Sequence, residues 1–424
     1  MNITLSATLA ANEEITRRRR AGQRVLNLAF GEAGLPVHPA LRERLAAASP
    51  DNGYGPVAGA ASLREAAAGY WTRRGLPTDP GLVVCGPGSK PLLYALLPAI
   101  GGDIVLPAPS WVSYAAQADL AGVRPIMVPV PPGEGGAPDP ERVAEAVRRA
   151  RASGRTVGSM LVTLPDNPTG RLASPRTVRR LAQLARDLDL MIISDEIYRD
   201  LVHDERAAFL SPADVAPERT VVTSGLSKSH ALGGWRIGVA RLTSAPLRDR
   251  LLAIASEIWS SPAAPVQHAA AYAYTEPPEL VERVAASRRL HGIVARAVAE
   301  RFARAGARVH TPQGGFYLYP DLAPLGRFAT SGELAASLLD GHGVGVLPGT
   351  AFGDAPGALR VRVATSLLYG EAEEQRLAAL SADRPLELPW VAESLAHLGE
   401  ALDALTDRRR YAAWIPPTLV PATP

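Results

Sequence analysis

Residues 223–240 read TSGLSKSHALGGWRIGVA, and this stretch carries the most specific pattern in the chain. Lys228 stands between two serines, and Arg236 follows it eight residues later. Short apolar runs of the kind found in buried strands flank the small residues, so we expect Lys228 to lie on a loop between two strands. An arginine at this spacing can hold a phosphate through two hydrogen bonds.

Lysine is nearly absent from this chain. Only Lys90 and Lys228, among 45 Lys and Arg residues, are lysines, which a coding bias toward arginine explains in general. Arginine stays protonated and forms no imine, whereas lysine can lose its proton and become a nucleophile. Because Lys228 also has phosphate-binding types of residue around it, we expect it to be a reactive amine.

Short apolar runs alternate with helical stretches over the first two thirds of the chain. The runs are four to six residues long and apolar on both faces, which is typical of strands buried on both sides of a sheet. Their alternation with helices predicts an α/β fold whose large domain has a mostly parallel, seven-stranded-type sheet flanked by helices. The runs lie at 82–85, 103–106, 125–129, 160–164, 190–194, 220–223 and 236–240.

The length of 424 residues favours two packed lobes. After about residue 287 a long Ala- and Arg-rich helix (278–305) leads to short apolar runs at 309–312, 315–319, 345–347 and 359–364, as in a smaller α+β lobe. We therefore expect four parts: an N-terminal arm that joins the smaller domain (1–45), a large domain (46–285), the smaller C-terminal domain (286–410) and a tail (411–424).

The composition excludes several classes of protein. The chain is 47% hydrophobic and 21% charged, as in globular enzymes, and its net charge of +3 is too small to indicate a nucleic-acid partner. We see neither a signal peptide nor the ~18 uninterrupted apolar residues of a membrane span. The single cysteine cannot form an internal disulfide, which fits a reducing compartment. We expect a cytoplasmic protein with no membrane partner and no metal site.

Three further segments place suitable side chains after predicted strands. CGPGSK (85–90) leads into a helix whose N-terminus suits a phosphate. The same sequence is also typical of an ordinary strand-to-helix turn that binds nothing. Trp111 can stack on an aromatic ring or pack in the core. Asn167 offers an amide donor in a sequence that generic turns also use.

Asp195 ends another buried strand, and Tyr198 follows three residues later. A buried carboxylate is costly unless it is paired, and a pyridinium N–H is one such partner. An ionised Asp195 would keep that ring nitrogen protonated, so that the ring can accept electrons. Tyr198 can then reach a hydroxyl on the ring.

The sequence resembles the class I/II aminotransferases of the fold-type I pyridoxal-phosphate (PLP) enzymes, from Ser6 to about Ser366. The motifs DNPTG (166–170), SDEIYRDL (194–201) and SGLSKSHALGGWRIG (224–238) carry the resemblance through their order and spacing. It implies that Lys228 is the catalytic Schiff-base lysine. The other implied cofactor residues are Asp195 at the ring nitrogen, Tyr198 and Asn167 at the ring hydroxyl, Trp111 stacked on the ring, and Gly88, Ser89, Lys90, Ser227 and Arg236 at the phosphate.

The resemblance also implies substrate contacts. Arg360, in LRVRVATS (359–366), matches the arginine that clamps the substrate α-carboxylate, while Arg362 is either a second anion contact or, as we favour, a surface residue. Gly31 and Asn167 match positions beside the substrate. The chain departs from the family after Gly31, where Glu-Ala-Gly-Leu (32–35) replaces the common Glu-Pro-Asp-Phe, so the usual amino acids need not be its substrates.

The implied activity is transfer of an amino group from an amino acid to a 2-keto acid. The altered loop keeps open a specialised PLP enzyme that catalyses elimination, replacement, cyclisation or oxidation of an amino acid. A ligand-sensing regulator is a weaker alternative, because the resemblance already begins at Ser6. An inactive binding scaffold is also weaker, because Lys228 is retained. Tyr54, in NGYGPVAG (52–59), resembles a tyrosine that reaches the cofactor phosphate of the neighbouring subunit, which implies a homodimer with shared active sites.

Overall fold

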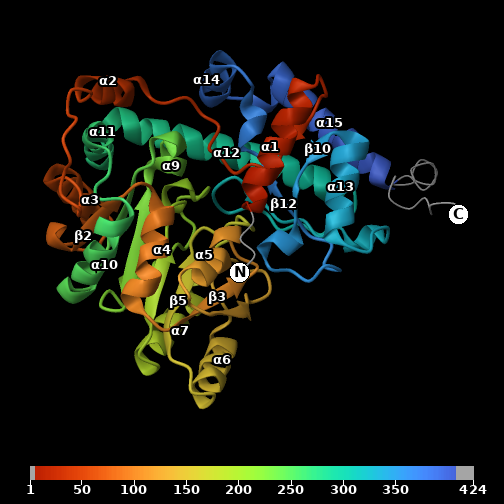
Figure 1. Ribbon diagram of the computed structural model, residues 1–424. Helices are drawn as coiled ribbons and strands as arrows, with labels where there is room; N and C mark the ends of the chain where they lie inside the picture. Colours follow the sequence, from red (N-terminus) through yellow and green to blue (C-terminus); the bar gives the residue numbers. More distant parts are fainter. Residues whose placement is uncertain (1–4, 407–424) are drawn as a thin grey trace, which may run out of the picture.

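The computed structural model describes residues 5–406, and a seven-stranded sheet forms the centre of its larger part (Figure 1). The strand order is β2-β8-β7-β6-β5-β3-β4. Strands β3 to β7 pair in parallel, whereas β8 is antiparallel to both neighbours. Every apolar run identified in this part of the sequence is a strand, so the predicted α/β class is confirmed. The strands are β2 (Val83–Gly86), β3 (Asp103–Ala108), β4 (Pro125–Pro129), β5 (Val157–Thr163), β6 (Met191–Asp195), β7 (Thr220–Gly225) and β8 (Gly238–Arg241).

Alternate side chains of the central strands enter separate hydrophobic cores. Met160 and Val162 of β5 pack in one core, whereas Leu161 between them packs in another. This explains why the strands carry apolar residues on both sides, since helices cover both faces of the sheet. One face is covered by α6 (Pro140–Ala152) and α7 (Pro175–Asp187), and the other by α4 (Ser89–Ile100), α5 (Val112–Leu120) and α10 (Ala245–Ile258).

A further core joins the beginning of the chain to its last third. It contains Leu26, Leu28 and Leu35 together with buried side chains between residues 290 and 405. Here β1 (Leu26–Asn27) pairs with β10 (Val344–Gly345), and a three-stranded sheet has the order β11-β12-β9. Its strands are β9 (Tyr317–Leu318), β11 (Leu347–Pro348) and β12 (Val361–Ala364). Figure 1 shows α1 (Ala7–Arg20) lying among these C-terminal elements.

The expected domain boundaries stay predictions. The helix α12 (Pro278–Arg304) runs through the expected boundary at 285/286 without a break. The prediction of a strand at 309–312 is wrong. Only an isolated bridge forms next to this segment, between Arg308 and Asp321. The expected tail at 411–424 lies outside the described residues.

None of the helices within residues 5–406 is long and apolar enough to cross a bilayer. The helices not yet named complete the two parts of the molecule. These helices are α2 (Pro39–Ala47), α3 (Ala61–Arg73), α8 (Pro212–Val215), α9 (Leu226–Ser229), α11 (Ala264–Tyr274), α13 (Ser331–His342), α14 (Glu373–Ser381) and α15 (Pro389–Thr406), with short 3-10 turns η1 (Pro80–Leu82), η2 (Arg199–Leu201), η3 (Gly233–Trp235), η4 (Ala323–Leu325), η5 (Gly349–Phe352), η6 (Ser366–Tyr369) and η7 (Pro385–Glu387).

The carboxyl ends of β5, β6 and β7 lie side by side because these strands are parallel neighbours. The segments that follow them carry Asn167, Tyr198 and Lys228. Lys228 lies in the four-residue helix α9 rather than on an open loop. The fold therefore brings together three motifs that are far apart in the sequence.

Candidate active site

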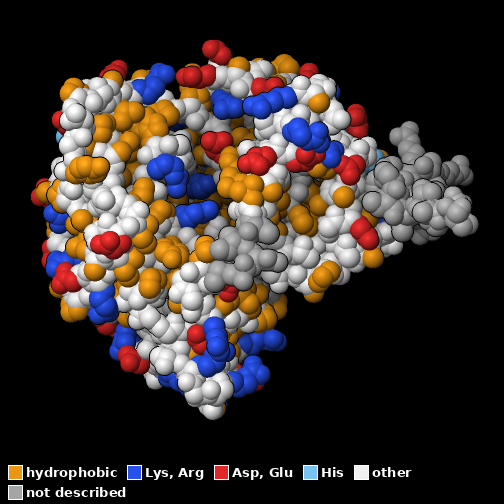
Figure 2. Space-filling model, in the orientation of Figure 1, with side chains coloured by type: hydrophobic (Ala, Val, Ile, Leu, Met, Phe, Trp, Pro, Cys, Tyr) orange, Lys and Arg blue, Asp and Glu red, His pale blue; other side chains and the backbone are white. Residues whose placement is uncertain are grey.

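A cavity of about 430 Å³ opens at this edge of the sheet. On the face drawn in Figure 2, Lys and Arg side chains gather in a hollow near the middle of the molecule. The lining of the cavity includes ten of the residues singled out in the sequence: Gly31, Ser89, Lys90, Trp111, Asn167, Asp195, Tyr198, Ser227, Lys228 and Arg236. Three others, Gly88, Tyr54 and Arg360, do not line it.

Gly88 lies directly behind one end of the cavity, against Arg236. Its φ of +99° is a conformation that side chains disfavour, and an added Cβ would lie 2.4 Å from Arg236 Nη2. Arg236 itself has a left-handed φ of 55°, and its Nη1 donates to the carbonyl of Gly233 at 2.8 Å. The guanidinium and the first turn of α4 therefore converge where an anion can sit.

Asp195 lies at the floor of the cavity and is almost fully buried. Its Oδ2 accepts a hydrogen bond from Tyr114 Oη at 2.8 Å, and its Oδ1 lies 3.4 Å from the amide nitrogen of Ile197. Burial raises the pKa of Asp195 to about 6, although the hydrogen bond from Tyr114 acts in the opposite direction. A cationic N–H partner in the cavity would therefore stabilise the ionised form.

Tyr114 is a site residue that the sequence analysis missed. It lies on α5, three residues after Trp111, and the two rings meet edge-on with centroids 5.2 Å apart. One helical turn thus presents both an aromatic wall and the hydroxyl that orients Asp195. The spacing of three residues was visible in the sequence, but only the position of α5 over the sheet reveals what Tyr114 reaches.

Lys228 points its amine into the cavity toward the small lobe. Its Nζ donates to the carbonyl oxygen of Gly31 at 2.6 Å and lies 5.8 Å from the centroid of the Tyr198 ring. The hydroxyl of Tyr198 is 2.9 Å from that of Tyr317, a second residue whose role the sequence analysis missed. Burial raises the pKa of Tyr198 well above its usual range, so this phenol stays protonated.

The placement of Arg362 corrects the sequence analysis. Arg362 is not a surface residue: it is only 1% exposed and lines the cavity. Its Nη1 lies 3.4 Å from Asn167 Oδ1, its Nη2 donates to the carbonyl of Ala29, and its guanidinium lies 5.0 Å from the centroid of the Tyr317 ring. A buried guanidinium that faces a cavity is suited to bind an anion there.

Arg360, the residue expected to clamp the substrate, lies outside the cavity. Its Nη2 makes an ion pair with Asp354 Oδ1 at 2.5 Å, and its side chain is 37% exposed. Arg360 and Arg362 are two residues apart and so share a side of the chain, but Asp354 holds Arg360 just before β12 begins at Val361. The substrate role predicted for Arg360 is therefore not supported by its position.

Two other predicted features occupy different surroundings. Tyr54 is 95% exposed, so no side chain of the described residues covers it, and its expected role across a dimer stays a prediction. Glu32 borders the cavity after Gly31, whereas the next residue of the altered loop, Ala33, is buried against Tyr198 and Tyr317.

Comparison with known proteins assigns the family. The model of the family "Aminotransferase class I and II" matches residues 23–367. This chain belongs to that family. The probable aspartate/prephenate aminotransferase of Thermus aquaticus is 35% identical over 85% of this chain and 92% of its own length. The aspartate aminotransferase of Geobacillus stearothermophilus is 33% identical over 89% of this chain and 96% of its own.

Solved structures agree with this assignment. The aspartate aminotransferase of Thermus thermophilus with maleate superimposes with a TM-score of 0.81 and 29% identity, over 94% of this chain and 97% of that one. The enzyme is therefore an aminotransferase, as the sequence predicted, and the matches do not favour the alternative of a specialised elimination or oxidation enzyme.

Proposed function

We propose that this aminotransferase binds pyridoxal 5′-phosphate in the cavity, with Lys228 as its covalent anchor. The observation that carries the proposal is the convergence of one of only two lysines with a buried carboxylate, Asp195, in a cavity that ends in an anion cradle. The residues at the two ends of the cavity fit the two ends of the cofactor. A phosphate needs cations and N–H groups, whereas the ring nitrogen needs a carboxylate.

Each part of the cavity suits one part of the cofactor. Arg236, Ser89 and Ser227 would hold the phosphate, with Gly88 leaving room for Arg236. Trp111 offers a flat face for the ring. Asn167 and Tyr198 would bond the ring hydroxyl, and Tyr114 fixes the direction of Asp195.

The residues of the chain then divide the work of proton transfer. When bound, the cofactor supplies an aldehyde that reacts with amines and a ring that takes up the electrons of the broken Cα–H bond. Asp195 would hold the proton on the ring nitrogen. The free amine of Lys228 would move a proton between the substrate Cα and the carbon that bears the cofactor's aldehyde. Tyr198, which keeps its proton, would donate to the ring hydroxyl.

Arg362 is the residue we propose to bind the substrate α-carboxylate, in place of Arg360. Its bond to Asn167 fixes the guanidinium beside the expected position of the cofactor. Two flat donor groups on a guanidinium match the two oxygens of a carboxylate, so this contact also sets the orientation of the Cα–H bond.

A dicarboxylic amino acid such as aspartate is the proposed amino donor. The relatives quoted above are named for aspartate, and we assign to the second carboxylate a cation of the cavity that the resemblance had assigned to the phosphate. That cation is Lys90, whose Nζ lies 5.0 Å from the centroid of the Trp111 ring. Burial, together with Arg236 and Lys228, lowers the pKa of Lys90, and a second carboxylate would relieve this repulsion.

The proposed acceptor is a 2-keto acid, and the proposed assembly is a homodimer in which Tyr54 reaches the neighbouring cofactor site. Exposure of a tyrosine at 95% is unusual for a residue with so much apolar area, which supports a partner surface there. The cytoplasmic location stays a prediction.

A half-reaction tests the function. The PLP form is mixed with one amino acid and no keto acid, and the keto acid and ammonia released are both measured. We expect one keto acid per site, no ammonia, and a faster reaction with aspartate than with alanine, a preference that Lys90→Gln should reduce. Release of ammonia or peroxide would contradict transamination, and a preference that Lys90→Gln leaves unchanged would contradict the role of Lys90.

A further inference from the structure

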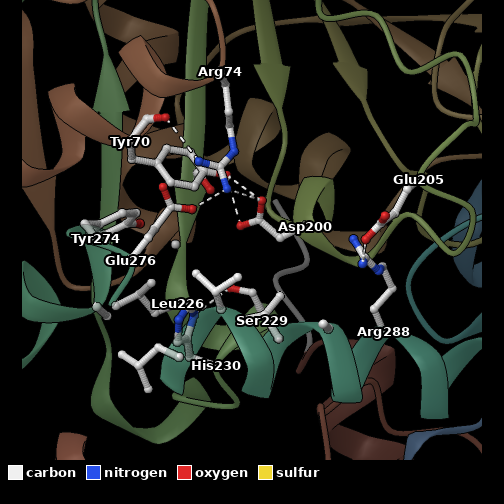
Figure 3. Close-up of a pocket in the computed structure, with 17 residues that line it drawn as sticks. Tyr70, Arg74, Asp200, Glu205, Leu226, Ser229, His230, Tyr274, Glu276 and Arg288 are labelled. Carbon is white, nitrogen blue, oxygen red and sulfur yellow. Dashed lines mark hydrogen bonds and ion pairs between the residues drawn. The ribbon is translucent and has the colours of Figure 1, made fainter. Parts of the chain in front are cut away.

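A second cavity lies on the other side of the helix that carries Lys228. It has a volume of about 190 Å³ and is lined by residues of α3, α9, α11 and α12 (Figure 3). Leu226 and Ser229 of α9 face this cavity, whereas Ser227 and Lys228 face the first one. Among residues 5–406 none lines both cavities, so the second is a separate space.

One wall of the second cavity holds charges of both signs. Arg74 Nη2 is 2.9 Å from Asp200 Oδ1 and 2.5 Å from Glu276 Oε1, and Tyr70 Oη donates to Asp200 at 3.0 Å. The three charged side chains are each about one-fifth exposed, so they are accessible from the cavity. Figure 3 shows this group on one side and the side chains of Ser229 and His230 opposite.

The opposite wall offers an unused hydrogen-bonding atom. His230 is 9% exposed, and its Nδ1 lies 2.9 Å from the hydroxyl of Ser229. Its Nε2 makes no hydrogen bond within the part of the chain that the structure describes. Burial lowers the pKa of His230 to about 4, so the ring is neutral near pH 7. A buried, half-satisfied imidazole facing a cavity indicates a polar occupant.

Part of the cavity lining is apolar, beside the ion pair of Glu205 and Arg288, which also lines it. Val281, on the first turn of α12, is 51% exposed although it is a large hydrophobic side chain. Leu280 and Val284 of the same helix also line the space. An apolar group that covered these side chains would be removed from water on binding, which favours an amphipathic occupant.

We propose that this cavity binds a free amino acid with an apolar side chain, as an effector distinct from the substrate. The ammonium group would meet the carboxylates of Asp200 and Glu276, and the carboxylate would meet Arg74 and His230. A zwitterion fits a wall that carries both signs, whereas an ion of either sign alone would face a like charge. The apolar side chain would cover Val281.

An occupant there touches the neighbours of two catalytic residues. Asp200 follows Tyr198 by two residues, and His230 follows Lys228 by two. A ligand that binds more tightly to one arrangement of these segments changes the population of that arrangement, and with it the turnover of the first site. Binding of an amino acid in the second cavity would thus change the rate at which the first site converts its substrate.

Calorimetry on enzyme with a blocked active site tests the proposal. The PLP-loaded enzyme is reduced with borohydride, so that Lys228 can no longer react, and L-leucine is titrated in. We expect saturable binding of about one leucine per chain. Isoamylamine and 4-methylpentanoate, which lack the carboxylate and the amine respectively, should each bind at least about tenfold more weakly. Absence of saturation by ~10 mM leucine, or equal binding of the three compounds, would overturn the proposal.

Matched variants locate the site. Val281→Asn should weaken leucine binding about fivefold by removing apolar contact, whereas Glu282→Asn, which places the same residue one position away, should not. Glu282 does not line this cavity but lines an adjoining pocket, which shares Glu205, Ala285 and Arg288 with it. In the unreduced enzyme, leucine should change kcat or KM for aspartate, and Val281→Asn should diminish that change. Binding that Val281→Asn leaves unaltered would place leucine elsewhere and contradict the assignment.

Discussion

Arg362 and Asn167 face each other in the active-site cavity, with Nη1 3.4 Å from Oδ1. One residue lies on β12 of the small sheet, and the other follows β5 of the large sheet. The contact joins the two parts of the molecule at the place where the substrate α-carboxylate is proposed to bind. It also distinguishes Arg362 from Arg360, which Asp354 holds outside the cavity.

Substituting these two arginines in turn should separate their roles. Arg362→Gln is expected to raise KM for the amino acid by about 10²-fold, because a charge-assisted pair of hydrogen bonds to the carboxylate is lost. Arg360→Gln should change KM by less than about threefold, since only a partly exposed ion pair with Asp354 is lost. Steady-state kinetics with aspartate measures both, and a larger effect from Arg360→Gln would show that the substrate carboxylate binds there instead.

The hydrogen bond from Tyr114 to Asp195 should matter for turnover. Asp195→Asn is expected to lower kcat by about 10²-fold or more, because a neutral amide cannot hold the proton on the ring nitrogen. Tyr114→Phe leaves the carboxylate in place but removes its donor, so kcat should fall by about tenfold. The rate of the absorbance change in a single turnover measures the effect of each substitution.

Retained cofactor distinguishes this effect from general damage to the site. Both variants should still bind PLP, since Arg236, the proposed phosphate ligand, is unchanged. Near-normal turnover in Asp195→Asn would contradict the role assigned to the carboxylate.

The central sheet could be predicted from the sequence because its strands are buried on both faces and therefore read as continuous apolar runs. Lys228 and Asp195 could be located because their motifs are contiguous. Arg362 could not be placed, because alternation puts it on the same side as Arg360 and only the ion pair with Asp354 decides between them. Tyr317 and Tyr114 reach the site from elements whose orientation no local pattern specifies.

Asp166 should make stability depend on pH. It is buried, its Oδ2 accepts from the hydroxyl and amide of Thr169, and its Oδ1 has no partner among residues 5–406. Burial raises the pKa of Asp166 to about 7. The native state therefore holds this proton more tightly than the unfolded chain, so stability falls as the pH rises from about 4 to 7.

Asp166→Asn tests this dependence, because the amide keeps an acceptor for Thr169 but cannot ionise. The variant should exceed the parent in Tm by about 3 °C or more at pH 8, and the advantage should shrink toward pH 5. Differential scanning calorimetry at the two pH values measures it. An equal difference in Tm at both pH values would rule out ionisation of Asp166 as the cause.

Mixed dimers should test the proposed sharing of active sites through Tyr54. Lys228→Ala and Tyr54→Ala homodimers should each have little activity. After mixing and subunit exchange, one of the two sites in each heterodimer would carry an intact Lys228 and an intact Tyr54 from the other chain. Activity should therefore rise to about a quarter of the unmodified level at equal mixing, half the dimers being mixed and half their sites intact. No recovery, with exchange verified by mass spectrometry, would contradict a shared site.

Reduction of the PLP-loaded enzyme with borohydride, followed by digestion and mass spectrometry, tests the central claim most directly. Trapping should attach one pyridoxyl group per chain to the peptide that contains Lys228, with Lys90 unmodified. A pyridoxyl group on the peptide of Lys90, or no covalent adduct at all, would contradict the account of this active site.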